Sequence, residues 1–288
     1  MKIIVESGGT KTSWRAVASD GTVHSLQTAG LSPTCLEDDL ISDIIRQAVP
    51  ALNPEGKAVS EIHFYGSGLV SDSSVFPVRS ALELWCPFAM IHFYSDLLAA
   101  ARALFGNGSG VVAIMGTGSN SCMYENGEIT RNIRPGGFIL GDEGSGSCLG
   151  RMFISDYIKG LLPAHIEKDF ATRFGLDYSR IVQKVYKEHT ASAFLASFAP
   201  YIMENTSDPY IYQMVYDCLE SFVSRALVRY SEGHSDYPLP AGVVGSFGCA
   251  CSSMLQEIGN KYGLKFTKFI KSPIDELVEY HSQESNTK

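Results

Sequence analysis

The segment from Val5 to Trp14, "VESGGTKTSW", contains two glycines, two threonines and a lysine, which are residue types that suit an anion. Glycines let the backbone approach a ligand closely, and exposed N–H groups together with a lysine attract a phosphate. The spacing is neither a Walker A pattern, because Thr10 separates Gly9 from Lys11, nor G-x-G-x-x-G. An ordinary glycine-containing hairpin turn has the same composition, so this loop alone leaves both interpretations open.

A second loop of this kind, "GTGS" from Gly116 to Ser119, occupies the same place in a repeated unit. In both copies the loop joins the first two strands of a predicted three-strand meander, and two copies imply two related domains. Loops at the strand ends of twin domains would face each other across a cleft, and clefts between domains are preferred ligand sites. We therefore expect one loop to hold the outer phosphates of a ligand and the other loop the inner ones.

Asp96 is the one carboxylate at a strand end between the two loops, directly after the apolar run 90–94. An aspartate before an apolar helix is typical of an N-cap, a role that Ser95 is able to share. The carboxyl end of a buried strand is also where open α/β sheets place groups that face a ligand. Because two candidate phosphate loops flank it in the sequence, we favour a functional role for Asp96 over a purely capping one. We predict that Asp96 is a general base.

Two further glycine-rich stretches are candidates for binding. Asp142 and Glu143 lie within "LGDEGSGS". Without any binding function, they would be solvated loop residues or would place a favourable negative charge at a helix N-terminus. Five glycines from Gly136 to Gly146 make simple solvation less favoured. "VVGSFG" follows an apolar strand, so Gly245, Ser246 and Gly248 would let a flat base lie against the backbone, although this motif alone is weak.

The elements that position these groups are predicted from their periodicity and turns. The Asp20-Gly21 and Asn126-Gly127 turns mark hairpins. The expected strands are 3–6, 13–18, 22–27, 61–68, 90–94, 111–115, 120–124, 128–130, 241–247 and 264–270. Helices are expected at 71–85, 97–105, 147–159, 251–262 and after Pro273, with several between 159 and 232. The apolar stripe from Ile211 to Leu227 on the longest of these indicates core packing.

Length and charge narrow the function classes. The chain has 288 residues, of which 45% are hydrophobic, and this suffices for two ordinary domains. A net charge of −8 argues against nucleic acid or an anionic membrane face as a partner, since both attract basic surfaces. The apolar runs are too short to span a bilayer, and seven cysteines without a repeating spacing fit a reducing compartment. The expected location is the cytoplasm.

The order of these parts resembles the superfamily of sugar kinases, heat-shock ATPases and actin. Within it, the chain is similar to the BadF/BadG/BcrA/BcrD ATPase family, whose sugar-phosphorylating members are N-acetylglucosamine kinases. The likeness covers nearly the whole chain and is carried by "GGTKT", Asp96, "GTGSN", "GGFILGDEGS" and "VVGSFG". Of these, "GTGSN" followed by "GGFILGDEGS" is the most specific.

The resemblance implies an α/β fold of two ribonuclease-H-like (actin-like ATPase) domains that flank a nucleotide cleft and close on their ligands. The first would span 1–107 and be joined by the C-terminal helix over 272–288, and the second would span 108–271 with a helical insertion. ATP and Mg²⁺ would be the cofactors, and a small-molecule sugar the partner. N-acetylglucosamine is the first candidate, N-acetylmuramic acid or another hexosamine the second. The oligomeric state stays open, with a homodimer as one alternative.

Site residues follow from the resemblance position by position. The ATP contacts would be Gly9, Thr10, Lys11, Thr12, Thr117, Gly118, Gly245, Ser246, Phe247 and Gly248. The sugar would lie against Thr34, Asp96, Gly136, Gly137 and Asp142, with Asp96 as the base. Glu6 stands where the family has an aspartate that orients magnesium, and its extra methylene changes the geometry open to Mg²⁺. Phe138 stands where a tryptophan would stack on the sugar.

Two alternatives to a sugar kinase remain at the level of sequence. Some family members are ATPases that activate a reductase or dehydratase and share an iron–sulfur cluster held by cysteines of two subunits, which needs four thiolates. Here Cys122, Cys148, Cys249 and Cys251 fall within predicted core elements. The other alternative is a sugar sensor without catalysis, in which Glu6 has replaced a working magnesium ligand.

Overall fold

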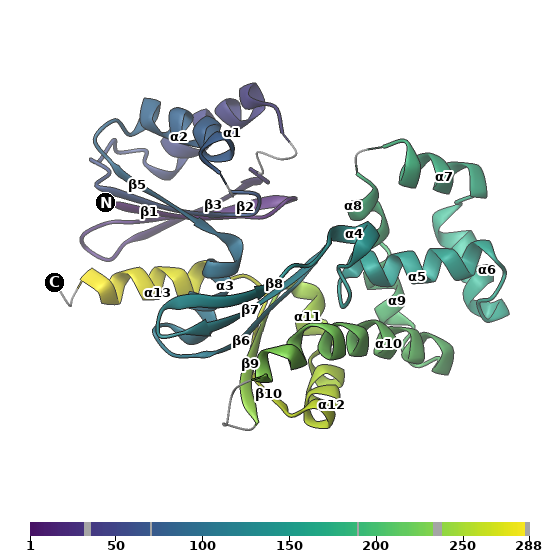
Figure 1. The fold of residues 1–288 in the computed structure, drawn as a ribbon. Coiled ribbons are helices and arrows are strands. Elements are labelled where there is room, and N and C mark those ends of the chain that lie inside the picture. The colour runs from purple at the N-terminus through teal and green to yellow at the C-terminus, as the bar shows by residue number, and fades with distance from the viewer. Residues whose placement is uncertain (32–35, 70, 189, 233–237, 286–288) are drawn as a thin grey trace. The chain divides into compact units, whose positions relative to one another are not determined.

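A computed structural model describes residues 1–31, 36–69, 71–188, 190–232 and 238–285 (Figure 1). The chain divides into two compact units. The first consists of Met1–Asn107 together with Ser272–Lys288, and the second of Gly108–Lys271. No helix in the described ranges combines the length and the apolar character that crossing a membrane demands.

The first unit is built on a five-stranded mixed sheet in the order β3-β2-β1-β4-β5. The first three strands pair antiparallel as the predicted meander, and β4 and β5 run parallel to β1. The strands are β1 (Lys2–Ser7), β2 (Lys11–Val17), β3 (Val23–Ala29), β4 (Glu61–Gly66) and β5 (Met90–Ser95). The helices are α1 (Asp38–Leu52), α2 (Asp72–Trp85), α3 (Asp96–Phe105) and α13 (Ile274–Ser285).

The two faces of this sheet are covered by different helices (Figure 1). Successive side chains of a strand point to opposite faces, so Ile3 and Val5 lie on one face while Ile4 and Glu6 lie on the other. Ile3 and Val5 share a core with residues of α1 and α2. Ile4 packs with Ala99 of α3 and Leu277 of α13. Glu6 therefore belongs to the face that α3 and α13 cover.

The second unit contains a five-stranded sheet of the same topology, in the order β10-β9-β6-β7-β8. Again the first three strands form an antiparallel meander, and two parallel strands extend the sheet from the first of them. The repeat predicted from the sequence is confirmed, and the two-domain α/β class with it. The strands are β6 (Gly110–Met115), β7 (Ser119–Glu125), β8 (Glu128–Ile133), β9 (Leu239–Val244) and β10 (Leu264–Ile270).

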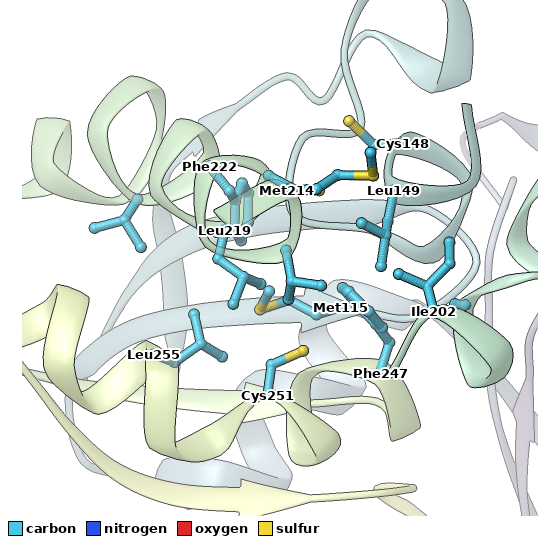
Figure 2. Close-up of a cluster of buried hydrophobic side chains, with 14 of the residues drawn as sticks. Met115, Cys148, Leu149, Ile202, Met214, Leu219, Phe222, Phe247, Cys251 and Leu255 are labelled. Atoms are coloured by element: carbon cyan, nitrogen blue, oxygen red, sulfur yellow. The ribbon is translucent and has the colours of Figure 1, made fainter. Parts of the chain in front are cut away.

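A helical insertion follows β8 and supplies most of the core of the second unit. Its helices are α4 (Gly137–Leu140), α5 (Gly146–Ile158), α6 (Ala164–Phe174), α7 (Tyr178–Tyr186), α8 (Ala191–Ala196), α9 (Ala199–Glu204), α10 (Pro209–Arg225) and the 3₁₀ helix η1 (Leu227–Ser231). After β9 come α11 (Ser246–Ala250) and α12 (Ser252–Tyr262). Figure 2 shows Met115, Leu149, Leu219 and Leu255 directed into one interior. The predicted packing role of the α10 stripe is confirmed.

Helix α1 is not among the elements expected from the sequence. Its buried residues Ile41, Ile45, Ala48 and Leu52 have helical spacing, so an amphipathic signal was present. Pro50 lies in its last turn, where a proline ordinarily argues against a helix interior. The short helices α4 and α11 were also missed, because four or five residues give no period to detect.

Candidate active site

The carboxyl ends of the three parallel strands of the first unit lie in register. Ser7 of β1 pairs with Gly66 of β4, which pairs with Ser95 of β5. The glycine loop that follows Ser7 and the residue that follows Ser95 therefore leave the sheet at the same edge. This edge is where ligands bind in open α/β sheets.

Buried hydroxyls hold the first loop from below. The hydroxyls of Ser7 and Thr12 lie 2.8 Å apart, and the Leu31 N–H donates to both, at 2.9 and 3.0 Å. Gly30 packs directly under the loop, since a Cβ there would lie 2.5 Å from the Gly8 carbonyl oxygen. Thr12 is completely buried, so its side chain supports the loop from inside the protein and is not accessible to a phosphate.

The upper part of the loop is exposed. Gly9, Thr10 and Lys11 are all open to solvent, and the Gly8 N–H donates to the Lys11 carbonyl at 3.0 Å to close the turn. Three of the four residues predicted for phosphate contact in this loop are therefore accessible, with the Lys11 ammonium at their end.

Glu6 lies beside this loop on a partly buried face. Burial raises the pKa of its carboxyl, and the negative charge of Asp96 raises it further. The Lys11 ammonium and the Ser272 hydroxyl, just before α13, both lower it. The charges of Lys11 and Asp96 therefore both act on Glu6, although the three residues come from β2, α3 and β1. The Ser272 hydroxyl is buried beside the Glu6 carboxyl.

Asp96 is the first residue of α3, and Ser95 is its N-cap, because the Ser95 hydroxyl accepts the Leu98 N–H at 3.1 Å. The capping role considered for Asp96 thus falls to Ser95. One carboxylate oxygen of Asp96 accepts the Leu97 N–H at 2.8 Å. Burial raises the pKa of Asp96 against the lowering effect of this and its own backbone N–H. A partly buried carboxyl fixed by backbone donors, with a pKa moved toward neutrality, is suited to accept a proton.

The second loop is tied to the helical insertion. The N–H groups of Gly146 and Ser147, at the start of α5, donate to the carbonyls of Gly116 and Thr117 at 2.9 and 3.0 Å. The Ser119 hydroxyl donates to the Glu143 carbonyl at 2.7 Å. Thr117 itself is exposed, so its hydroxyl is open to a ligand.

Asp142 lies against Gly118. A Cβ at Gly118 would be 2.9 Å from an Asp142 carboxylate oxygen, so only glycine leaves room for this contact. Asp142 is 8% exposed and has a φ of +54°, a left-handed conformation that is uncommon for residues other than glycine. Burial raises the pKa of its carboxyl, while the Ser119 N–H that it accepts lowers it. A buried carboxylate held in a strained conformation is a marker of a functional position.

Beside Thr117 lies a pocket of about 280 Å³, whose walls include Gly146, Ser246 and Phe247. Apolar residues of α9, among them Ala199 and Met203, form its other side. A mostly apolar pocket with a few polar groups at its mouth suits a flat base. Thr117, Ser246 and Phe247, all predicted as ATP contacts, are thus brought together.

Gly245 and Gly248 have packing roles in the same region. A Cβ at Gly245 would lie 2.2 Å from the Met115 carbonyl oxygen, and one at Gly248 would lie 2.4 Å from a Val243 methyl group. Gly248 is buried. These glycines let α11 approach β6 and β9, which positions Ser246 at the pocket rather than offering open backbone to a base.

The predicted sugar residues of the second unit surround α4. Gly136 is its N-cap, in the left-handed conformation with φ +79°, and Gly137 is its first residue. Phe138 faces a different hollow, next to Ile154 and Tyr178. Thr34, the remaining predicted sugar contact, lies outside the described residues.

Mg²⁺ is bound in proteins by one or two carboxylates together with phosphate oxygens and water. No cluster of three or more His, Cys, Asp or Glu able to hold a metal occurs within the described ranges. The oxygens available beside the first loop are the Glu6 and Asp96 carboxylates and the neighbouring Ser272 hydroxyl. This all-oxygen donor set fits magnesium in the presence of a phosphate.

Three contributors to this region were missed at the level of sequence. Ser7, Gly30 and Ser272 act on the first loop or on Glu6 only through the fold. Gly30 offered a signal, since it follows the predicted strand 22–27 by three residues and a glycine near a strand often marks a close approach of backbones. Ser272 offered none, because a serine before a helix ordinarily indicates a cap.

Comparison with solved structures finds likenesses along nearly the whole chain. A protein of Porphyromonas gingivalis assigned as an N-acetylglucosamine kinase is 34% identical, with a TM-score of 0.91 over 99% of this chain and 100% of that one. One from Chromobacterium violaceum with the same assignment is 19% identical, with a TM-score of 0.75 over 97% and 98%. A ROK family glucokinase from Streptomyces griseus, in complex with glucose and AMPPNP, is 16% identical, with a TM-score of 0.59 over 98% of both chains. The last two show the shared fold alone. No protein-family model and no curated protein matches the sequence.

Proposed function

The chain belongs to the N-acetylglucosamine kinase-like group of the BadF/BadG/BcrA/BcrD ATPase family, and we propose that it transfers the γ-phosphoryl group of ATP to a hydroxyl of N-acetylglucosamine. Two observations support the assignment. The first is 34% identity over the full length to a protein assigned that activity. The second, which carries the chemistry, is the Asp96 carboxyl held at the sheet edge beside Glu6 and Lys11.

Asp96 acts as the general base in this proposal. It follows the carboxyl end of β5, and the Leu97 N–H donates to one of its carboxylate oxygens at 2.8 Å. The raised pKa strengthens it as a proton acceptor, provided that it is ionised at the working pH. The sugar hydroxyl gives its proton to Asp96 as its oxygen attacks the γ-phosphorus, and ADP leaves with the bridging oxygen.

The loops hold the phosphates so that the attack is in line. Phosphoryl transfer demands positioning and charge neutralisation more than covalent chemistry from the protein. In the first loop, the amides of Gly9 and Thr10 and the Lys11 ammonium supply donors for the terminal phosphates. In the second, the Thr117 hydroxyl and the Gly118 amide are further donors. The pocket at Ser246 and Phe247 takes the adenine.

Glu6 and Asp96 are the carboxylates that would hold Mg²⁺, with Ser272 as a neighbouring oxygen. When bound to ATP, Mg²⁺ neutralises phosphate charge and so lowers the barrier to attack. Asp142, buried against Gly118, orients the sugar together with the backbone of Gly136 and Gly137. Its raised pKa is consistent with a carboxyl that accepts a sugar hydroxyl in place of water.

An ADP-release assay across N-acetylglucosamine, N-acetylmannosamine, glucosamine and glucose, with a control lacking sugar, tests the function. We expect N-acetylglucosamine to give the highest kcat/KM and the control to release little ADP. ADP release that is independent of sugar would identify an ATPase instead. Sugar binding in calorimetry without turnover, under any divalent metal, would identify a sensor.

Glu6 separates the kinase from the sensor. If Glu6 is a working ligand, Glu6→Asp retracts the carboxylate by about one C–C step of 1.5 Å and lowers activity. Mn²⁺ should then restore activity better than Mg²⁺, and Glu6→Gln should lose more because the charge is removed. If glutamate has destroyed the metal site, Glu6→Asp should raise activity. Initial rates are measured over a Mg²⁺ titration at saturating sugar. The kinase hypothesis predicts a lower rate for Glu6→Asp than for wild type, and the sensor hypothesis predicts a higher one.

The cytoplasm is the location that we propose along with this function. The cysteines in the described part of the chain are free, as expected of a reducing compartment that also supplies ATP. The net charge of −8 supports a small-molecule partner over nucleic acid or an anionic membrane.

A further inference from the structure

The second unit contains a pocket that the proposed catalytic chemistry does not use. Its volume is about 210 Å³, and it lies between the β7–β8 hairpin and the end of α10. Arg134, Arg225 and Arg229 all line it, and Glu143 is the one carboxylate among its lining residues. We call it the arginine pocket. Three guanidinium groups against one carboxylate give its walls an excess of two positive charges in a chain of net charge −8.

The three arginines differ in how far protein partners satisfy them. Arg225 forms an ion pair with Glu143 at 3.0 Å. The Arg229 Nε lies 3.9 Å from Glu232, a long contact between two exposed side chains. Arg134 is exposed and forms no hydrogen bond or ion pair with any residue in the described ranges. Two guanidinium groups are therefore left with donors for a ligand.

The wall of this pocket adjoins the predicted sugar loop. Gly136, Gly141 and Glu143 line it, so the chain on both sides of Asp142 contributes to the wall. Ser119, Asn120 and Ser121 form another part, whereas Gly116 and Thr117 line the pocket proposed for adenine. The segment from Gly116 to Ser121 thus separates two hollows, of which the apolar one suits a base and the basic one an anion.

We propose that the arginine pocket binds an oxyanion, a carboxylate or a phosphate, carried by a sugar-sized molecule. A guanidinium matches the planar geometry of a carboxylate or phosphate with two parallel N–H donors. A pocket of about 210 Å³ is small beside the usual range for whole ligands, roughly 300–1,000 Å³, and so suits one charged substituent. The link to a sugar rests on the proposed kinase function, because it assumes that the sugar lies against Gly136 and Asp142.

This oxyanion has two possible sources in a sugar kinase. A carboxylate on the acceptor would make an acidic amino sugar a better substrate than its neutral parent. The phosphate of the sugar-phosphate product would make that product an inhibitor. Both sources use the same arginines, but they affect turnover in opposite directions.

Calorimetry at 0.15 M salt with three probes tests the pocket. The probes are N-acetylmuramic acid, which carries a carboxylate, N-acetylglucosamine 6-phosphate, and neutral N-acetylglucosamine. The test variant is Arg134→Gln with Arg229→Gln, and the control is Arg180→Gln, an exposed arginine of α7 outside the pocket. We expect the test variant to weaken binding of at least one anionic probe by about 10-fold or more, since charge-assisted hydrogen bonds are lost. Binding of the neutral sugar should change by less than about 2-fold.

The source of the oxyanion follows from steady-state kinetics. If the pocket binds a carboxylate, wild type should have a higher kcat/KM for the acidic sugar than for the neutral one. The test variant should lose this difference. A product subsite predicts competitive inhibition by the 6-phosphate that the test variant relieves. Equal affinity of wild type and test variant for both anionic probes would overturn the proposal. Arginine-dependent anion binding without ADP release from any sugar would uphold the pocket and refute the kinase, so the two failures are distinguishable.

Discussion

The β1–β2 loop and the β6–β7 loop hold equivalent places in two sheets of one topology, yet different parts of the chain support them. The first loop is braced by its own strands. Ser7 and Thr12, the paired residues at its base, share a hydrogen bond and fix the Leu31 N–H that follows β3. Its geometry is therefore a local property of the meander.

The second loop depends on a segment that follows the meander. Gly146 and Ser147 donate to its carbonyls, and Asp142 packs on Gly118. The loop from β8 to α5 therefore sets the conformation of the second loop. A helical insertion can fix the conformation of a loop in a repeated fold in this way, and here it ties the β6–β7 loop to the segment that we propose binds the sugar.

The comparison also separates two kinds of carboxylate. Beside the first loop, Glu6 and Asp96 lie close enough for the charge of Asp96 to affect the pKa of Glu6, and Lys11 is near. Beside the second, Asp142 is fixed by a backbone contact and a backbone donor. We infer that the first unit supplies the reacting charges and that the second orients the substrates.

The largest effect should come from removing the base in the first unit. We expect Asp96→Asn to lower kcat by roughly 10²–10⁴-fold, the usual range for a general base, with little change in ATP affinity. Asp72→Asn is the matched control, since Asp72 is also the first residue of a helix with a serine N-cap. Steady-state kinetics and nucleotide titration provide the measurements. Equal, small losses in both variants would make Asp96 a helix-terminal charge and no more.

A smaller effect should come from separating Asp142 from the second loop. The Cβ of Gly118→Ala would lie 2.9 Å from an Asp142 oxygen, so the carboxylate must move. We expect KM for the sugar to rise about 10-fold, the scale of one lost hydrogen bond to a charged group, while KM for ATP changes less. In an Asp142→Ala background, Gly118→Ala should raise KM for the sugar by less than about 2-fold more, because the carboxylate that would clash with the new Cβ is absent. Additive effects of the two substitutions would contradict the contact.

The local support of the first loop should appear mainly in stability. A Cβ in Gly30→Ala would lie 2.5 Å from the Gly8 carbonyl oxygen, and neither backbone can yield easily. We expect a loss of about 1–3 kcal/mol, the usual effect of overpacking, measured by urea unfolding. Gly9→Ala meets no atom within 4 Å and serves as the stability control. A Gly30→Ala protein as stable as the control would mean that the loop is held in some other way.

The smallest effect concerns the charge at Glu6. Because burial raises the pKa of Glu6 above its ordinary value of 4.5, its ionised form destabilises the folded state at neutral pH. That destabilisation disappears as the pH falls through the folded pKa. Glu6→Gln should therefore raise Tm at pH 7, by about 2–4 °C per kcal/mol recovered, and the gain should fade toward pH 4. Glu257→Gln, at an exposed position of α12, is the control. A lower Tm for Glu6→Gln at pH 7 would show that the attraction of Lys11 for the Glu6 carboxylate outweighs the cost of burial.

The sequence by itself determined the repeat, the order of strands and helices, and the identity of the two loops. These features rest on local signals, namely alternating apolar residues, the Asp20-Gly21 and Asn126-Gly127 turns, and glycines after strands. Asp96 could be singled out because its place at the end of a strand is also a local property. Helix α1 was missed although the helical spacing of Ile41, Ile45 and Ala48 was present in the sequence.

Only the tertiary structure decided which of these residues a ligand can reach and how they are charged. Thr12 was a phosphate candidate by composition, but the packing of Leu31 buries its hydroxyl. Ser272 approaches Glu6 from the far end of the chain, and Arg134, just after β8, lines the same pocket as Arg229 of η1. Burial and charge interactions depend on neighbours that are distant in sequence, and no periodicity along the chain records which distant residues will meet.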